Sequence, residues 1–270
     1  MIPIIGGVFA AGGFANNMFS EVAGTGNTTL SQWLHLAPDP LGRPYNCLRA
    51  YISQTDYYVP GGQNKYRSEI AGKFQNLSWN QTYIYHWRMV VPRDWINLGA
   101  SSYLVVFQMH DVNGGSVSRR PTFAGEIANG SLDLVFSRDS VTGGETVYST
   151  PVTAGQEFEI TIRVRWADGT NASDSDGFVE IFDGDALVYS GSGRNTWAGT
   201  AITEPNPPYL KCGVYQPGPG SSWWNGRAAT MYFQAAFVID GDYAPAQLRQ
   251  WVDAQLRDNS NAPVTWIPTS

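Results

Sequence analysis

The sequence predicts an all-β protein: one large sandwich of two antiparallel sheets, followed by a single short helix. Charged residues make up only 15% of the 270 residues, whereas 29 glycines and 16 prolines supply many turn positions. Aromatic residues reach 13%, which also suits the binding of sugar rings. A chain of this length could form one large sandwich or two ordinary domains. Because no linker or internal repeat divides it, we expect one domain.

The predicted strands are alternating or short apolar stretches bounded by Gly, Pro, Asn and Ser. The clearest amphipathic strand is 158–166, where the apolar side chains share one face and the charged ones share the other. A turn at Asp183-Gly184 can supply the positive φ angles of a hairpin. The predicted strands and hairpin span residues 47–52, 66–70, 82–91, 103–110, 131–137, 145–149, 158–166, 178–189, 209–216 and 230–239.

The two ends of the chain differ from the predicted sandwich, which we assign to residues 31–243. Residues 1–30 are rich in Gly, Ala and Asn without a period, so we expect an extended arm with little regular structure that packs on the domain or on a partner subunit. Residues 244–270 form a helix and tail. The helix is predicted because Leu248, Val252 and Leu256 recur at helical spacing after Pro245.

Three predicted strands place polar side chains on one face. Strict alternation in 103–110 puts Gln108 and His110 on the same face as Leu104 and Val106. The other two strands repeat this arrangement. If the three strands are neighbours, one sheet face carries Arg67, Glu69, Gln108, His110, Lys211 and Tyr215. Leu210, Cys212 and Val214 then lie on the opposite face.

These segments resemble a known family. Arg67-Ser68-Glu69-Ile70, Gln108-Met109-His110 and residues 209–216 are similar, in order and spacing, to three signature blocks of the jelly-roll polysaccharide lyases. That group includes the family seven alginate lyases, the glucuronan lyases and relatives of heparin lyase I. Residues 85–95 resemble the strand that precedes the Gln-x-His strand, and the likeness spans roughly residues 45 to 240. The resemblance implies a concanavalin-like β-jelly-roll.

The resemblance also implies cleavage of an acidic, uronic acid-containing polysaccharide by β-elimination, without a cofactor. Removal of the C5 proton needs donors that stabilise the enolate-like intermediate, and a general base and acid. By resemblance, Arg67 and Gln108 neutralise the carboxylate, and His110 and Tyr215 transfer protons. Glu69 fixes Arg67 through an ion pair. The expected substrate-binding residues are Glu69, Lys211, Arg88, Tyr209 and Gln216.

Two other functions remain open from the sequence. A non-catalytic carbohydrate-binding or structural module, such as a phage tail component with a lyase-like fold, would share the same sandwich. A glycoside hydrolase would need two carboxylates flanking the bond, and we find no such pair beside Gln108 and His110. Neither the polymer, alginate or glucuronan for example, nor the oligomeric state follows from the sequence.

The net charge excludes some classes of binding partner, and the two cysteines allow a prediction of their redox state. A net charge of −6 argues against a nucleic-acid or anionic-membrane binder. We find no membrane span, and the apolar residues 2–15 lack the positive charges of a secretory signal, although we expect an extracellular or virion-associated protein. Cys47 and Cys212 are expected to be buried thiols, with a disulfide as the alternative.

The sequence gives little support for a metal-binding site. Asp168, Asp174 and Asp176 could bind calcium, but an ordinary solvated turn explains them as well. His86 lacks a second ligand at metal spacing, and His35 lies in a loop-like stretch. We therefore expect no metal site.

Overall fold

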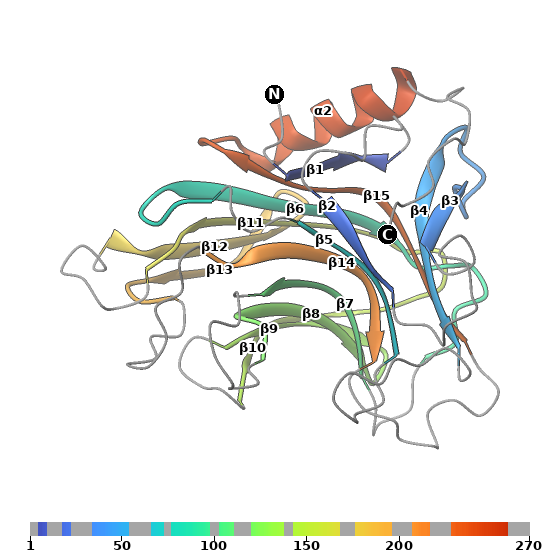
Figure 1. The fold of residues 1–270 in the computed structure, drawn as a ribbon, viewed down its shortest axis with the longest axis horizontal. Helices are drawn as coiled ribbons and strands as arrows, with labels where there is room; N and C mark the ends of the chain where they lie inside the picture. The colour runs from blue at the N-terminus through green and yellow to red at the C-terminus, as the bar shows by residue number, and fades with distance from the viewer. Residues whose placement is uncertain are drawn as a thin grey trace.

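A computed structural model of the chain shows a sandwich of two antiparallel sheets (Figure 1). The described part of the chain contains fifteen strands and one helix. The prediction of an all-β sandwich with a short C-terminal helix is confirmed. The structure describes residues 5–9, 18–22, 34–53, 66–72, 77–97, 103–110, 120–137, 143–167, 176–195, 207–216 and 228–258.

One sheet has eight strands in the order β13-β12-β11-β6-β15-β4-β3, and β1 also pairs with β15. The strands are β1 (Ile5–Val8), β3 (Leu34–Pro38), β4 (Asn46–Ser53), β6 (Thr82–Val90), β11 (Glu157–Arg165), β12 (Phe178–Asp183), β13 (Ala186–Ser192) and β15 (Ala228–Asp240).

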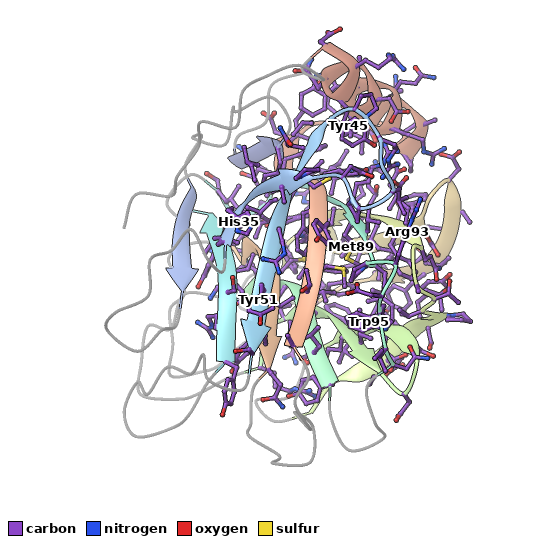
Figure 2. The ribbon with its side chains drawn as sticks, turned by 90° about the vertical axis from the view of Figure 1, so that its right-hand side faces the viewer. His35, Tyr45, Tyr51, Met89, Arg93 and Trp95 are labelled. Carbon is purple, nitrogen blue, oxygen red and sulfur yellow. The ribbon has the colours of Figure 1, made fainter. Side chains whose placement is uncertain are left out.

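The second sheet has seven strands in the order β10-β9-β8-β7-β14-β5-β2. The strands are β2 (Met18–Val22), β5 (Tyr66–Gly72), β7 (Tyr103–His110), β8 (Phe123–Ala128), β9 (Ser131–Phe136), β10 (Glu145–Pro151) and β14 (Tyr209–Gln216). The core lies between the two sheets (Figure 2, where the buried Met89 is labelled). We call the face of the seven-stranded sheet that is turned away from this core the outer face.

Helix α2 (Pro245–Asp258) packs on the other side of the eight-stranded sheet, beside β1 in Figure 1. Leu248, Val252 and Leu256 are buried there, as their helical spacing predicts, and they pack with Phe237 of β15 in a second hydrophobic cluster. No helix among the described residues is long and apolar enough to cross a membrane.

Three expectations for this fold were wrong. The arm 1–30 packs on the domain as predicted, but the expectation of little regular structure fails, because it contains β1 and β2, which pair with β15 and β5. Their order comes from hydrogen bonds to strands far along the chain, which a period in the local sequence does not reveal. Strands β3 and β8 were also not predicted, and His35 lies in β3 rather than in a loop. Cys47 and Cys212 are buried free thiols, as expected.

Buried polar groups link the two sheets at the start of β14. The Tyr85 hydroxyl donates a hydrogen bond to the carbonyl oxygen of Pro208 at 2.5 Å and accepts one from the Trp166 indole at 3.0 Å. The Trp87 indole donates to the carbonyl oxygen of Lys211 at 3.3 Å. These bonds tie β14 to side chains of the opposite sheet.

We predict that Tyr85→Phe lowers the free energy of unfolding by about 1–3 kcal/mol, because it leaves a buried carbonyl and a buried indole N–H unpaired. Chemical denaturation measures this change. Tyr232→Phe, which alters a partly exposed tyrosine, is the control and should shift stability by less than about 0.5 kcal/mol. Equal stabilities of the two variants would contradict the structural role of the Tyr85 hydroxyl.

Candidate active site

The three strands that carry the predicted site are adjacent in the seven-stranded sheet, in the order β7-β14-β5. Tyr215 of β14 lies opposite Arg67 of β5, and Lys211 lies opposite Gln108 of β7. Leu210, Cys212 and Val214 belong to the core, so the alternate residues of β14 face outward. The structure therefore brings the predicted residues of three distant segments onto the outer face.

The site is built around one buried carboxylate. The Glu69 side chain is 0% exposed, and its Oε2 lies 3.0 Å from Nε of Arg67. Its Oε1 accepts a 2.6 Å hydrogen bond from Nε2 of Gln108. A charge this deeply buried requires such partners, since an uncompensated carboxylate would be strongly destabilising. Glu69 thus holds Arg67 and Gln108 in fixed orientations from two different strands.

Tyr215 lies directly under the arginine. The Arg67 guanidinium carbon is 4.4 Å from the centre of the Tyr215 ring. Burial raises the pKa of Tyr215 above its ordinary value, although the positive charge of Arg67 opposes this change. At neutral pH the phenol is therefore protonated, which suits a proton donor.

His110 and Lys211 extend the site along β7 and β14. Both lie beside Tyr209: the His110 and Tyr209 rings are 6.0 Å apart, and Nζ of Lys211 is 5.4 Å from the Tyr209 ring centre. Lys211 is only 3% exposed, whereas His110 is half-buried. Tyr209 is thus a neighbour of both the imidazole and the ammonium group.

A bulge in β7 sets the orientation of Gln108 and His110. Val106 is an extra residue between the pairs that β7 makes with β8, and Leu104, Val106 and Phe107 all face the core. The expectation that Gln108 and His110 share a face with Leu104 and Val106 was therefore wrong. The bulge reverses the alternation, and it is the reason that both polar side chains face outward.

The model of a family described as polysaccharide lyase matches residues 39–261, which is most of the chain. The chain belongs to the polysaccharide lyase family. No curated protein sequence matches it significantly.

Solved structures with the same fold include an endo-β-1,4-glucuronan lyase from Trichoderma reesei, with 15% identity and a TM-score of 0.57 over 83% of this chain and 95% of that one. The alginate lyase AlgAT5 of polysaccharide lyase family 7 matches at 12% identity and a TM-score of 0.56, over 84% and 95% of the two chains. These similarities confirm the predicted β-jelly-roll sandwich.

The fold also occurs in glycoside hydrolases. The catalytic domain of a GH131 β-glucanase from Podospora anserina matches at 14% identity and a TM-score of 0.53, over 84% of this chain and 86% of that one. At such identities the likeness concerns the fold alone. The chemistry must be inferred from the side chains.

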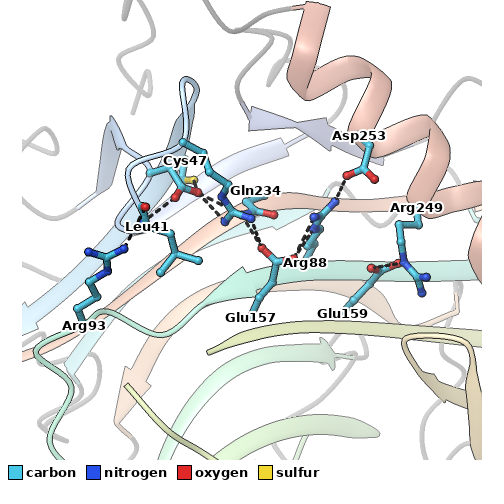
Figure 3. A network of polar contacts seen from close by, with 11 residues as sticks. Leu41, Cys47, Arg88, Arg93, Glu157, Glu159, Gln234, Arg249 and Asp253 are labelled. Atoms are coloured by element: carbon cyan, nitrogen blue, oxygen red, sulfur yellow. Dashed lines mark hydrogen bonds and ion pairs between the residues drawn. The ribbon is translucent and has the colours of Figure 1, made fainter. Parts of the chain in front are cut away.

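Two residues predicted to bind substrate lie apart from the others. Arg88 belongs to β6 of the other sheet, where its guanidinium pairs with Glu157 at 2.9 Å and with Asp253 of α2 (Figure 3). Gln216 is 4% exposed and lies opposite Tyr66, a residue of the core. Alternation in β6 indicated a polar face but not which sheet or which side it belonged to. We therefore leave Arg88 and Gln216 out of the proposed site.

The polar network around Arg88 serves to attach the helix. Arg249 of α2 pairs with Glu159 of β11 at 2.9 Å, beside the contact between Arg88 and Asp253 (Figure 3). His86, which neighbours Arg88 on the same face, is fully buried, and burial lowers its pKa to about 3. His86 therefore stays neutral, in agreement with a structural role.

The structure adds outer-face residues that the sequence did not single out. Tyr103 of β7 and Glu126 of β8 flank Arg120, whose guanidinium lies 5.8 Å from the Tyr103 ring centre and 3.2 Å from Glu126. Asp133 of β9 lies opposite Glu126. Because β8 lacks clear alternation, the sequence did not reveal that Glu126 faces outward.

Some predictions fall outside the described residues. These concern Asp168 and Asp174 of the calcium alternative, whereas Asp176 is described and exposed. Among the residues that are described, no group of three or more His, Cys, Asp or Glu side chains could hold a metal ion.

We predict that Gly213→Ala destabilises the protein by about 3 kcal/mol or more, through overpacking and backbone strain. Gly213 has a φ of +146°, and a Cβ there would lie 2.2 Å from the carbonyl oxygen of Ser68, so β14 could not stay paired with β5. Gly42→Ala is a matched control, because Gly42 also has a positive φ of +82° but has no atom within 4 Å of a Cβ.

Thermal or chemical denaturation measures both glycine variants. The control should lose only about 1 kcal/mol, the strain of a positive φ alone. Similar losses in the two variants would show that close pairing of β14 with β5 at Gly213 is not required.

Proposed function

We propose that this protein cleaves a uronic acid-containing polysaccharide by β-elimination on the outer face of the seven-stranded sheet. The observation that carries the proposal is the buried Glu69, which orients Arg67 beside Tyr215 and accepts a hydrogen bond from Gln108. Membership of the family supports the reaction class. The glucuronan and alginate lyases that share the fold support a uronate as the reacting sugar.

The first chemical requirement is to stabilise negative charge on the substrate. Glu69 engages the Nε side of the Arg67 guanidinium, so the Nη groups are the donors that would bind the uronate carboxylate. The Arg67 side chain is 21% exposed and accessible to a ligand. Gln108 is only 1% exposed, so its contact with the carboxylate requires the side chains over it to shift when substrate binds.

The second requirement is a base and an acid. Neutral His110 takes the C5 proton, and the electron pair of that C–H bond forms the C4–C5 double bond as the C4–O bond breaks. Tyr215 then gives its phenolic proton to the leaving glycosidic oxygen. The raised pKa of Tyr215 favours this role as the acid, and in the unliganded protein it disfavours the alternative in which Tyr215 is also the base.

Hydrolysis is a second candidate, since a GH131 β-glucanase shares the fold. It would need an acid and a second carboxylate on either side of the bond. Glu69 already contacts Arg67 and Gln108, so it is poorly suited to either role. The neighbouring carboxylates Glu126 and Asp133 are bound by Arg120 and Ser149. A non-catalytic carbohydrate-binding module is the third candidate, and the same experiment separates all three.

We predict that the protein converts polyuronates into products with the ultraviolet absorbance of an unsaturated uronate, and that Tyr215→Phe lowers kcat at least about 100-fold, because the acid is lost. Tyr51→Phe, which alters a partly exposed tyrosine of β4 in the other sheet, should keep wild-type activity.

The outcomes of this assay separate the candidates. Reducing ends that appear without ultraviolet absorbance would identify a hydrolase. Binding of polyuronates without any product would identify a binding module. Full activity of Tyr215→Phe would contradict the proton-transfer role of the phenol.

A further inference from the structure

The proposed active site continues across the sheet in a single row. Register places Val105 of β7 opposite Tyr215, Glu126 opposite Val105, Asp133 opposite Glu126, and Ser149 opposite Asp133. Residues directly opposite each other in a sheet point to the same face. The row therefore runs over six adjacent strands on the outer face and consists of Arg67, Tyr215, Val105, Glu126, Asp133 and Ser149.

Core packing independently confirms the direction of the carboxylates. Phe123 and Ile127 of β8 and Leu132 and Leu134 of β9 belong to the core, so Glu126 and Asp133 on the alternate positions point outward. Asp133 accepts a 2.6 Å hydrogen bond from the Ser149 hydroxyl. Burial raises the pKa of Glu126, Arg120 opposes the change, and the negative charge of Asp133 adds to it.

The charge on this face changes sign along the row. Among the side chains that the structure describes, the β5-β14-β7 part has two cations, Arg67 and Lys211, with the single carboxylate Glu69. The β8-β9 part has the single cation Arg120, which already pairs with Glu126. Asp133 adds a second carboxylate there. A bound anion is thus favoured at one end of the row and disfavoured at the other.

The β5-β14-β7 part and the β8-β9 part of the outer face are close enough to bind the same polymer chain. Neighbouring strands lie about 4.8 Å apart, so β8 is roughly 10 Å and β9 roughly 15 Å from the strand that carries Tyr215. Tyr103 lies between the two parts, since it belongs to β7, which is flanked by β14 and β8, and its ring lies beside Arg120. A sugar chain that extends from Tyr215 over β7 next meets Tyr103 and Glu126.

We propose that Tyr103, Glu126 and Asp133 form a subsite for an uncharged sugar, so that the substrate is a heteropolysaccharide in which the cleaved uronate is followed by a neutral residue. This inference rests on the proposed lyase function. The carboxylates accept hydrogen bonds from sugar hydroxyls, and the Tyr103 ring packs on the apolar face of the pyranose. A second uronate at this position would meet two carboxylates and only one cation, Arg120, which leaves a net negative charge. The subsite therefore selects against homopolymers of uronic acids.

The test compares polyglucuronate with a polymer of alternating glucuronate and glucose. The wild type should show a kcat/KM about tenfold higher for the alternating polymer, the effect of one unfavourable charge contact. Glu126→Gln and Asp133→Asn keep the side-chain shape but remove a negative charge, so each should raise kcat/KM for polyglucuronate about five- to tenfold. Their effect on the alternating polymer should be smaller.

Glu180→Gln is the control, because it removes a carboxylate that pairs with Arg163 in the other sheet. It should leave the ratio of the two kcat/KM values unchanged. A wild type that prefers polyglucuronate, or a ratio that neither Glu126→Gln nor Asp133→Asn changes, would overturn the subsite.

Equilibrium binding of the same two polymers separates this inference from the proposed function. Absence of unsaturated product from both polymers would refute the lyase reaction. The subsite would still be supported if the wild type bound the alternating polymer more tightly and Glu126→Gln removed the difference. Equal binding of both polymers by the wild type would overturn it.

Discussion

The site depends on one interaction, the buried contact of Glu69 with Arg67 and Gln108. A carboxylate that is fully removed from water has to be neutralised and hydrogen-bonded, and its partners here come from two strands that are not adjacent to each other. Their positions are therefore fixed before substrate arrives. Preorganised donors of this kind stabilise developing negative charge without reorganising during the reaction.

Strand β14, which lies between β5 and β7, is held in place both by β5 and by the core. Gly213 allows β14 to approach β5 more closely than any side chain would permit. From the core, Tyr85 and Trp87 of the opposite sheet bind the carbonyl oxygens of Pro208 and Lys211. These contacts connect the packing of the sandwich to the position of Tyr215, and helix α2 on the far side stabilises the sheet that provides them.

Alternation in residues 66–70 and 209–216 predicted the outward side chains because β5 and β14 pair with each other without a shift in register. It failed in β7 because the bulge at Val106 depends on how β8 pairs, which local sequence does not encode. Strand β8 was missed because Gly125 breaks its pattern, and that glycine is required by the ring of Phe107, 2.4 Å from the position of a Cβ. Arg88 was misplaced because alternation defines a face without identifying its sheet.

The most direct test is a crystal structure of Tyr215→Phe with a bound uronate oligosaccharide. The account predicts that the uronate carboxylate lies within hydrogen-bonding distance of Arg67 and Gln108, with its C5 hydrogen directed at His110. A carboxylate bound instead at Arg120, or an oligosaccharide bound on the face that α2 covers, would contradict it.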